Sequence, residues 1–217
     1  MDKIVLGGSD GAIEAVAMTA ALNGAKVTFG TILLAGFAFA IAGGFSMFFS
    51  SYLSSRAEME SLRIDVQRER MEIETEPEEE KAELEELLRK DGYKQNEVDV
   101  IMGRLVKDKE MWLRTQLRHE LRLNIEDLAT DPLVRPGSAG LAFFLLALLA
   151  LSPYGLRLEH FEALVASVAL SLCALFALSS RVFTPSHFKP KAGLESALVG
   201  LLAAGLLYGV GYLISAL

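Results

Sequence analysis

Several residues and motifs are scarce or missing in this sequence, and each absence excludes a class of function. Cysteine occurs once, as Cys173 in an apolar run, so the chain can form no internal disulfide and no cysteine metal cluster. A Walker A glycine loop is missing, which argues against an ATP-driven pump. No histidine follows a glutamate by three positions, so the Glu-x-x-His pattern of di-iron bundles is absent. No nucleophile stands beside a base and an orienting residue, so we do not expect an enzyme.

Basic patches are missing as well. The formal net charge is −7 and no basic stripe stands out, which argues against nucleic acid as a partner. Hydrophobic residues make up 52% of the 217 positions although 23% are charged, and both values hold only if the two kinds occupy different segments. Residues 1–25 do not form a secretory signal, because Asp10 and Glu14 interrupt its apolar stretch. The composition therefore indicates a polytopic protein of the lipid bilayer with one soluble subdomain.

Charge is concentrated in residues 56–131. This segment holds 22 of the 28 acidic residues and 14 of the 21 basic ones, so it carries a formal −8 while the rest of the chain carries +1. We therefore divide the chain into transmembrane helices 1 and 2 (residues 1–55), an acidic helical domain (residues 56–131) and transmembrane helices 3 to 5 (residues 132–217). The predicted fold class is all-α.

Five apolar stretches are candidate membrane spans. They are residues 4–22, 28–53, 138–152, 161–180 and 193–216. The second carries small residues suited to close helix packing in lipid, and the fifth has a GxxxG spacing. These residues are Gly36, Ala40, Gly43 and Gly44 in the second span and Gly205 and Gly209 in the fifth.

The loops assign an orientation to these spans. Residues 181–191 contain three bases and no acid, whereas the loops at 23–27 and 153–160 contain one base each. The positive-inside rule then places the N-terminus, the acidic domain and the 181–191 loop in the cytoplasm, and the C-terminus on the opposite side.

The acidic domain is predicted to be helical throughout. No proline or glycine intervenes between Leu53 and Glu76, so the second span should continue as one helix to about Thr75, protruding by roughly 30 Å. A second helix should begin at Pro77 and end at Asp91-Gly92. A third helical region should run from about residue 96 to 128, with Gly103 as the place for a break, and Pro132 and Pro136-Gly137 should end the domain.

Two carboxylates lie within the first span. A carboxylate there costs roughly 2.5–3.5 kcal/mol on insertion scales and usually marks an ion path. Asp10 and Glu14 are one helical turn apart on the same face, where they can share a cation or a proton. The alternatives are that Asp10 is solvated at the interface and that Glu14 pairs with a lysine or lines a water-filled cleft.

The soluble segment contains a series of regularly spaced acidic residues, here called the acidic ladder. Successive members are four, three and four residues apart, which places them on one helical face, where like charges repel unless a cation neutralises them. The ladder consists of Asp65, Glu69, Glu72 and Glu76, continued by Glu80 and Glu83 on the next helix and by Glu120 on the third, where His119 is a candidate extra ligand. The arginines between these acids are equally consistent with a solvated helix face. The spacing alone therefore does not decide between a solvated face and a divalent-cation site. Oxygen ligands suit Mg²⁺, Ca²⁺, Mn²⁺ and Fe²⁺.

Four stretches resemble motifs of the vacuolar iron transporter family. SDGAIE at 9–14 is similar to the NDG signature of the family's first helix, and AGGFSMFFSSYLSS at 42–55 to its AGxxSMxxxEYxS stretch. QRERMEIETEPEEEKAEL at 67–84 is similar to the segment EREREEIEEDPEEE, and LRHEL at 117–121 to MxxEL. The matches occur in the family's order over nearly the whole chain.

This resemblance implies a homodimer with five transmembrane helices and a three-helix cytoplasmic metal-binding domain inserted after the second. It implies transport of Fe²⁺, and also of Mn²⁺, out of the cytosol by proton antiport, with these ions as cargo and no prosthetic group. By motif position, Asp10 and Met47 correspond to ligands in the membrane path, although a methionine in a span more often only packs. The counterparts of the family's domain ligands are Glu69, Glu72, Glu80, Glu83 and Glu120.

Three positions depart from the family pattern. Ser51 stands where a glutamate is usual, and Glu14 stands where small or hydroxyl residues are usual. We therefore hypothesise that Glu14 supplies the membrane-path acid that Ser51 does not. Gln116 and Leu117 replace a frequent methionine pair, which removes soft ligands and predicts a site that selects less sharply for Fe²⁺ over Mn²⁺.

Two functions of different classes compete for these features. One is a divalent metal transporter, and the other is a membrane-anchored sensor or storage module that binds metal without moving it. Asp10 and Glu14 favour the transporter, because a mere anchor has no use for carboxylates inside a span.

Overall fold

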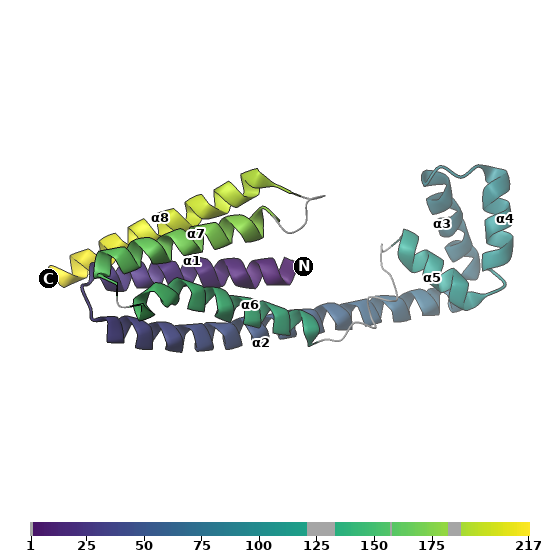
Figure 1. Cartoon of the computed structure of the whole chain (residues 1–217). Coiled ribbons are helices and arrows are strands. Elements are labelled where there is room, and N and C mark those ends of the chain that lie inside the picture. The colour runs from purple at the N-terminus through teal and green to yellow at the C-terminus, as the bar shows by residue number, and fades with distance from the viewer. Residues whose placement is uncertain (1, 121–132, 157, 182–187) are drawn as a thin grey trace. The chain divides into compact units, whose positions relative to one another are not determined.

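The computed structural model describes residues 2–120, 133–156, 158–181 and 188–217 (Figure 1), and these residues form helices joined by short turns. They divide into two compact units. The membrane unit consists of Met1–Leu53 and Pro132–Leu217, and the acidic unit of Ser54–Asp131.

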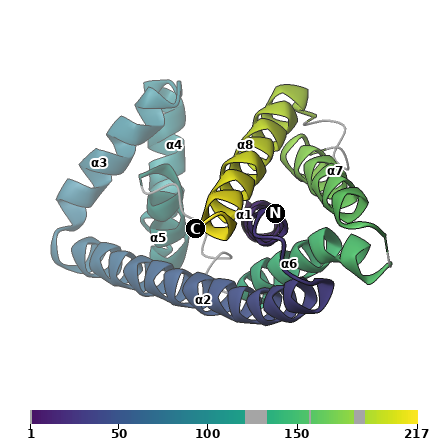
Figure 2. The same cartoon turned by 90° about the vertical axis from the view of Figure 1, so that its left-hand side faces the viewer.

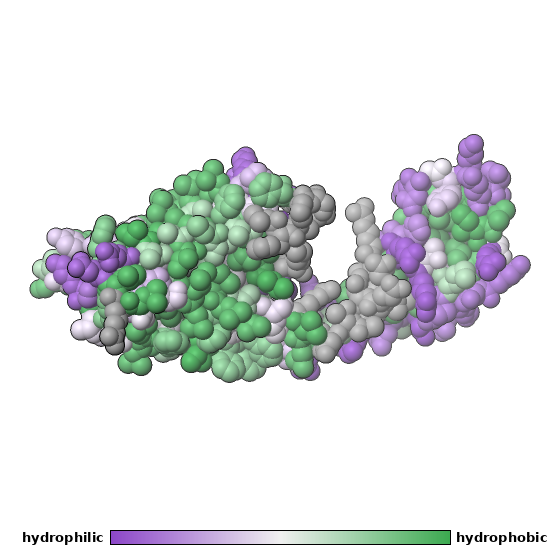
Figure 3. Space-filling view, in the orientation of Figure 1, coloured by the Kyte–Doolittle hydropathy of each residue, from purple (hydrophilic) through white to green (hydrophobic). Residues whose placement is uncertain are grey.

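Five helices among the described residues are long and apolar enough to cross a membrane, which confirms the five predicted spans. They are α1 (Asp2–Gly24), α2 (Phe29–Thr75), α6 (Val134–Leu151), α7 (His160–Ser179) and α8 (Pro190–Ser215). The short 3₁₀ helix η2 (Ser152–Gly155) follows α6 and begins the loop expected at 153–160. Pro136-Gly137 does not precede the third span as predicted but lies in the first turn of α6, where a proline needs no amide hydrogen bond. Apolar side chains dominate the visible surface of the membrane unit (Figure 3).

Helix α1 lies at the centre of the membrane unit, with α6, α7 and α8 around it (Figure 2). Its backbone approaches two neighbours so closely that only glycine fits at the contacts. A Cβ atom on Gly11 would clash with the carbonyl oxygen of Phe143 in α6, and one on Gly211 of α8 would clash with the carbonyl oxygen of Ala21 in α1. Close backbone approach through small residues is the packing mode expected between helices in lipid.

The small residues predicted to pack the second span do so, and their partner is α6. Gly36 lies against the Leu151 side chain, and Gly44 lies against the backbone carbonyl oxygen of Gly140. Gly205 and Gly209 of α8 behave differently, because no atom lies within 4 Å of a Cβ built on either of them. The GxxxG spacing in α8 therefore does not serve packing within the described part of the membrane unit.

The acidic unit contains the end of α2 followed by α3 (Pro77–Lys90), α4 (Gln95–Leu105) and α5 (Lys109–His119). Helix α2 runs unbroken to Thr75, and α3 starts with Pro77 in its first turn, both as predicted. Gly92 follows α3 with φ +99°, a left-handed conformation that favours glycine.

The third predicted helical region differs from the structure, which has two helices there. The break falls at residues 106–108, three residues beyond Gly103, because the Asp108 carboxylate accepts hydrogen bonds from the amides of Glu110 and Met111 and so caps α5. The predicted end of this region near residue 128, and Pro132, lie outside the described residues.

A separate hydrophobic core holds these helices together. Its buried residues are Ile73, Leu84, Leu88, Val98, Met102, Leu105, Trp112, Leu113 and Leu117.

Candidate metal centre

Three carboxylates from different helices of the acidic unit meet at one point. Glu69 comes from α2, Glu80 from the first turn of α3, and Glu120 from the residue that follows α5. One carboxylate oxygen of each lies within 4.8 Å of the others. We call these three residues the acidic cluster. It is the only such group of three or more Asp, Glu, His or Cys side chains in residues 2–120, 133–156, 158–181 and 188–217.

The helix period explains why these residues converge. Glu80 precedes the buried Leu84 and Leu88 at intervals of four, so it occupies the core-facing stripe of α3. Glu69 precedes the buried Ile73 by four residues on α2. The cluster thus lies where the apolar stripes end, and the fold that buries the leucines also buries the carboxylates.

Burial and mutual repulsion raise the proton affinity of two cluster members. Glu69 is only 1% exposed and Glu80 only 6%, whereas Glu120 is exposed. Burial, with repulsion from Glu120 and Glu72 and partly opposed by Arg68, raises the pKa of Glu69 from 4.5 to about 7. Burial, with repulsion from Glu69 and further glutamates, raises the pKa of Glu80 from 4.5 to about 7. A proton or a metal ion would relieve this repulsion.

Arg68 offsets only part of the negative charge. Its guanidinium lies 3.5 Å from Oε1 of Glu69, 3.8 Å from Glu72 and 3.7 Å from Asp65, and its side chain is half exposed. Oε2 of Glu69 is buried and has no hydrogen-bond partner. A buried carboxylate oxygen without a partner carries a large desolvation cost, which a bound cation would offset.

Gln116 lies beside the acidic cluster. The sequence analysis noted this residue only because it replaces a methionine that is frequent in the resembled motif. Its Nε2 donates hydrogen bonds to Oε2 of Glu80 at 2.9 Å and to Oε2 of Glu120 at 3.1 Å. The side chain is fully buried, and its Oε1 has no partner. The sequence did contain a sign that Gln116 is buried. It shares one apolar face of α5 with Trp112, Leu113 and Leu117, and a single polar residue on such a face needs a hydrogen-bond partner.

The remaining residues suggested for the domain lie outside the acidic cluster. Glu72 is partly exposed and paired with Arg68, and Glu83 is exposed, although the charges of both help to raise the pKa of Glu80. His119, suggested as an extra ligand, also lies outside the cluster, and its Nδ1 is 2.6 Å from the Asp91 carboxylate.

In the described part of the membrane unit, the suggested ligands Asp10, Glu14 and Met47 do not belong to a group of three or more metal-binding side chains. Asp10 and Glu14 lie one turn apart on α1; Asp10 is partly buried and Glu14 is exposed. Met47 of α2 packs against an apolar cluster that includes Ala15 and Phe143. Ser51, where the resembled motif has a glutamate, is buried.

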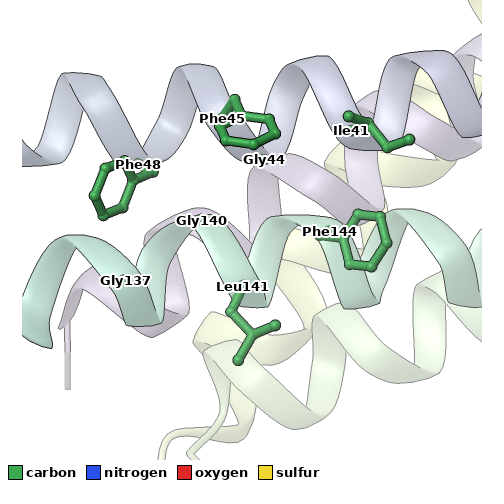
Figure 4. A pocket seen from close by; sticks show the side chains of 8 residues that line it. All are labelled: Ile41, Gly44, Phe45, Phe48, Gly137, Gly140, Leu141 and Phe144. Carbon is green, nitrogen blue, oxygen red and sulfur yellow. The ribbon is translucent and has the colours of Figure 1, made fainter.

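Two grooves lie among the described residues of the membrane unit. One lies between α2 and α6 and is lined by Ile41, Phe45, Phe48, Leu141, Phe144 and three glycines (Figure 4). The other is lined by Asn23, Lys26, His160, Phe161, Leu164 and Tyr208, so its one charged group is a cation. Neither groove contains a carboxylate.

Comparisons with known proteins agree on one family. The sequence profile of the VIT family matches residues 1–212. The chain is 33% identical over 205 residues to vacuolar iron transporter 1 of Arabidopsis thaliana, covering 93% of this chain and 80% of that protein. It is 33% identical over 210 residues to vacuolar iron transporter 1 of Eucalyptus grandis, covering 95% and 83%. It is 29% identical over 223 residues to the vacuolar iron transporter of Toxoplasma gondii, covering 97% and 73%.

Proposed function

Since the chain belongs to the VIT family, and is therefore a multi-pass membrane transporter and not an enzyme, we propose that it carries Fe²⁺, and also Mn²⁺, out of the cytosol in exchange for protons. One observation carries the choice of cargo. The acidic cluster presents two buried carboxylates and a third at its edge, with a buried oxygen of Glu69 that has no partner. All-oxygen sites of this kind suit hard and borderline divalent cations.

In this proposal the acidic unit is a cytoplasmic metal-binding domain. Glu69, Glu80 and Glu120 hold the ion, and Gln116 lies beside them. Glu72 and Glu83 add negative charge around the site and so raise the local concentration of cations. The N-terminus then shares the cytoplasmic side with this domain, and the C-terminus lies on the opposite side.

The membrane step is assigned to α1. Asp10 and Glu14 place two carboxylates in a span that packs against three other helices, where each carboxylate is costly unless it serves an ion. Met47 supplies a thioether suited to Fe²⁺. Because Glu14 is exposed on the described single chain, a second copy facing α1 would shield it from lipid, which supports a homodimer with paired first helices.

Proton coupling follows from the same carboxylates. Each can bind a proton or a metal ion, and binding of one lowers its affinity for the other. An inward proton gradient can then drive metal outward without ATP.

Proteoliposomes test this function. Vesicles with an acidic lumen, and with the acidic unit facing out, should take up Fe²⁺ and Mn²⁺, and Asp10→Asn should abolish the uptake. Uptake by the wild type that is indifferent to the pH difference would indicate a channel. Metal binding without any flux would indicate the membrane-anchored sensor or storage module instead.

A further inference from the structure

The carboxamide of Gln116 lies between two carboxylates of the acidic cluster. Its NH₂ group donates one hydrogen bond to Glu80 and one to Glu120, at 2.9 and 3.1 Å. In their ionised forms Glu80 and Glu120 only accept hydrogen bonds, and the structure accordingly turns the nitrogen end of the amide toward them. The NH₂ group therefore provides partial positive charge between two negative groups.

The other end of the amide is left unsatisfied. Oε1 of Gln116 is buried in a fully enclosed side chain and accepts no hydrogen bond, and Oε2 of Glu69 is likewise buried without a partner. Buried polar atoms without partners are rare in folded proteins and call for a functional explanation. Two such atoms belong to this one site, and a bound cation would provide a partner for oxygens of this kind.

A rotation of the amide by about 180° exchanges its nitrogen and oxygen without moving the rest of the side chain, since this terminal torsion is broad and two-fold. With no ion, the two carboxylates favour the NH₂ end. With a divalent cation among the carboxylates, the oxygen end is favoured, because amide carbonyls are ligands for hard cations and NH₂ groups are not.

We propose that Gln116 is a metal ligand of the acidic unit that changes orientation on binding: its NH₂ group holds Glu80 and Glu120 in the metal-free protein, and its Oε1 coordinates the ion when metal enters. This inference rests on the proposed function of the acidic cluster. It gives the site a fourth oxygen at a position where the related family often has methionine.

The rival role for Gln116 is that of a tether, which keeps donating hydrogen bonds to the carboxylates whether or not metal is present. The two roles respond differently to Gln116→Glu. A ligand role keeps an oxygen donor, so Mn²⁺ affinity stays the same or rises. A tether role loses both N–H donors and gains a fourth carboxylate in their place, so the cluster is forced apart and affinity falls.

The direct test uses Mn²⁺ on the full chain in detergent, synthesised cell-free with ¹³C at the side-chain carbonyl of glutamine. The sequence has three glutamines, Gln67, Gln95 and Gln116. Electron–nuclear double resonance of bound Mn²⁺ should show a ¹³C coupling that persists in the control Gln67→Leu and disappears in Gln116→Leu. Gln116→Leu should also weaken Mn²⁺ binding about 10-fold, and Gln116→Glu should not.

Each contrary result has a distinct meaning. Mn²⁺ bound in a manner sensitive to Glu69→Gln, but with no ¹³C coupling, would overturn the ligand role and leave the metal site standing. Mn²⁺ binding that is indifferent to Glu69→Gln would overturn both the ligand role and the acidic cluster as a metal site. Emission from Trp112, the chain's single tryptophan, shows whether each variant keeps the core of this unit folded.

Discussion

The two units of this chain arrange their carboxylates in opposite ways. The acidic unit brings one carboxylate from each of three chain segments to a common point and buries two of them. The membrane unit spaces Asp10 and Glu14 along a single helix, and in the described part of the chain no third Asp, Glu, His or Cys side chain joins them. The first arrangement has the geometry to surround an ion, whereas the second would present a passing ion with few ligands at a time.

The difference fits two separate tasks. A site that collects a scarce ion gains from several converging ligands, whereas a path must bind the ion strongly enough for it to enter and weakly enough for it to leave. We therefore expect substitutions in the membrane unit to stop flux without changing metal affinity at the acidic cluster. Substitutions in the acidic unit should change affinity first and flux less.

The largest effect should come from Glu14→Gln, which tests the membrane side of this comparison. If Glu14 supplies an acid in the path, the variant should abolish metal flux in proteoliposomes, as Asp10→Asn is expected to do. Glu195→Gln, a change to a largely exposed glutamate of α8, should leave flux intact. Wild-type flux in the Glu14→Gln variant would refute its role.

The membrane helices were predictable because length and apolarity suffice to identify a span. Among the described residues, α1, α2, α6, α7 and α8 meet both conditions. The ends of α3 were predictable because Pro77 and Gly92 act through local backbone chemistry. The capping of α5 by Asp108 was missed because the break was expected at Gly103. A single glycine is tolerated within a helix, and Gly103 lies inside α4.

The acidic cluster was only partly predictable. Sequence spacing places Asp65, Glu69 and Glu72 near one face of α2, but it cannot say which of them meets residues from α3 and α5. That choice depends on packing of the hydrophobic core, which buries Glu69 and leaves Glu72 partly exposed. Gln116 was missed as a site residue for the same reason, since its partners are 36 and four residues away.

Glu69→Gln should produce the next largest effect, on the acidic side of the comparison. It removes a buried carboxylate charge, so Mn²⁺ affinity should fall about 10–100-fold in titrations followed by Trp112 emission. Glu79→Gln changes an exposed carboxylate of the same unit and serves as the matched control. Equal affinities for the two variants would remove Glu69 from the site.

Metal binding to the acidic unit should release protons. Because Glu69 and Glu80 have pKa values of about 7, metal-free protein near neutral pH holds protons that the ion must displace, so Mn²⁺ affinity should rise with pH through about 7. Up to two protons per ion should appear in weakly buffered solution. Affinity independent of pH between 6 and 8 would contradict these raised pKa values.

The same shifts predict how stability depends on pH. Between the ordinary value of 4.5 and about 7, the folded protein binds more protons than the unfolded protein. The free energy of unfolding of the metal-free acidic unit should therefore fall as pH rises through this window. Thermal unfolding followed by Trp112 emission measures it, and excess Mn²⁺ at pH 8 should restore the lost stability.

Glu80→Leu should separate stability from binding. Glu80 shares the buried stripe of α3 with Leu84 and Leu88, so leucine there extends the core and removes a buried, repelled carboxylate. Metal-free protein at pH 8 should become more stable by about 1–2 kcal/mol while Mn²⁺ binding is lost. A destabilised variant would mean that Glu80 supports the fold and not only the site.

The smallest effect should concern the choice between metals. The acidic cluster and Gln116 offer only oxygen ligands, so Fe²⁺ and Mn²⁺ affinities of the full chain, measured anaerobically, should differ by less than about tenfold. Replacing both Gln116 and Leu117 by methionine adds soft thioethers at a cost in packing that should be small, since Leu117 is buried and methionine has a similar volume. The double variant should shift the ratio of Fe²⁺ affinity to Mn²⁺ affinity toward Fe²⁺ by a few-fold. Flux should still depend on Asp10, because the double variant leaves the membrane unit unchanged. A wild-type protein that already prefers Fe²⁺ strongly would show that an oxygen-only site can make this distinction, and the harder character inferred from Gln116 and Leu117 would then be wrong.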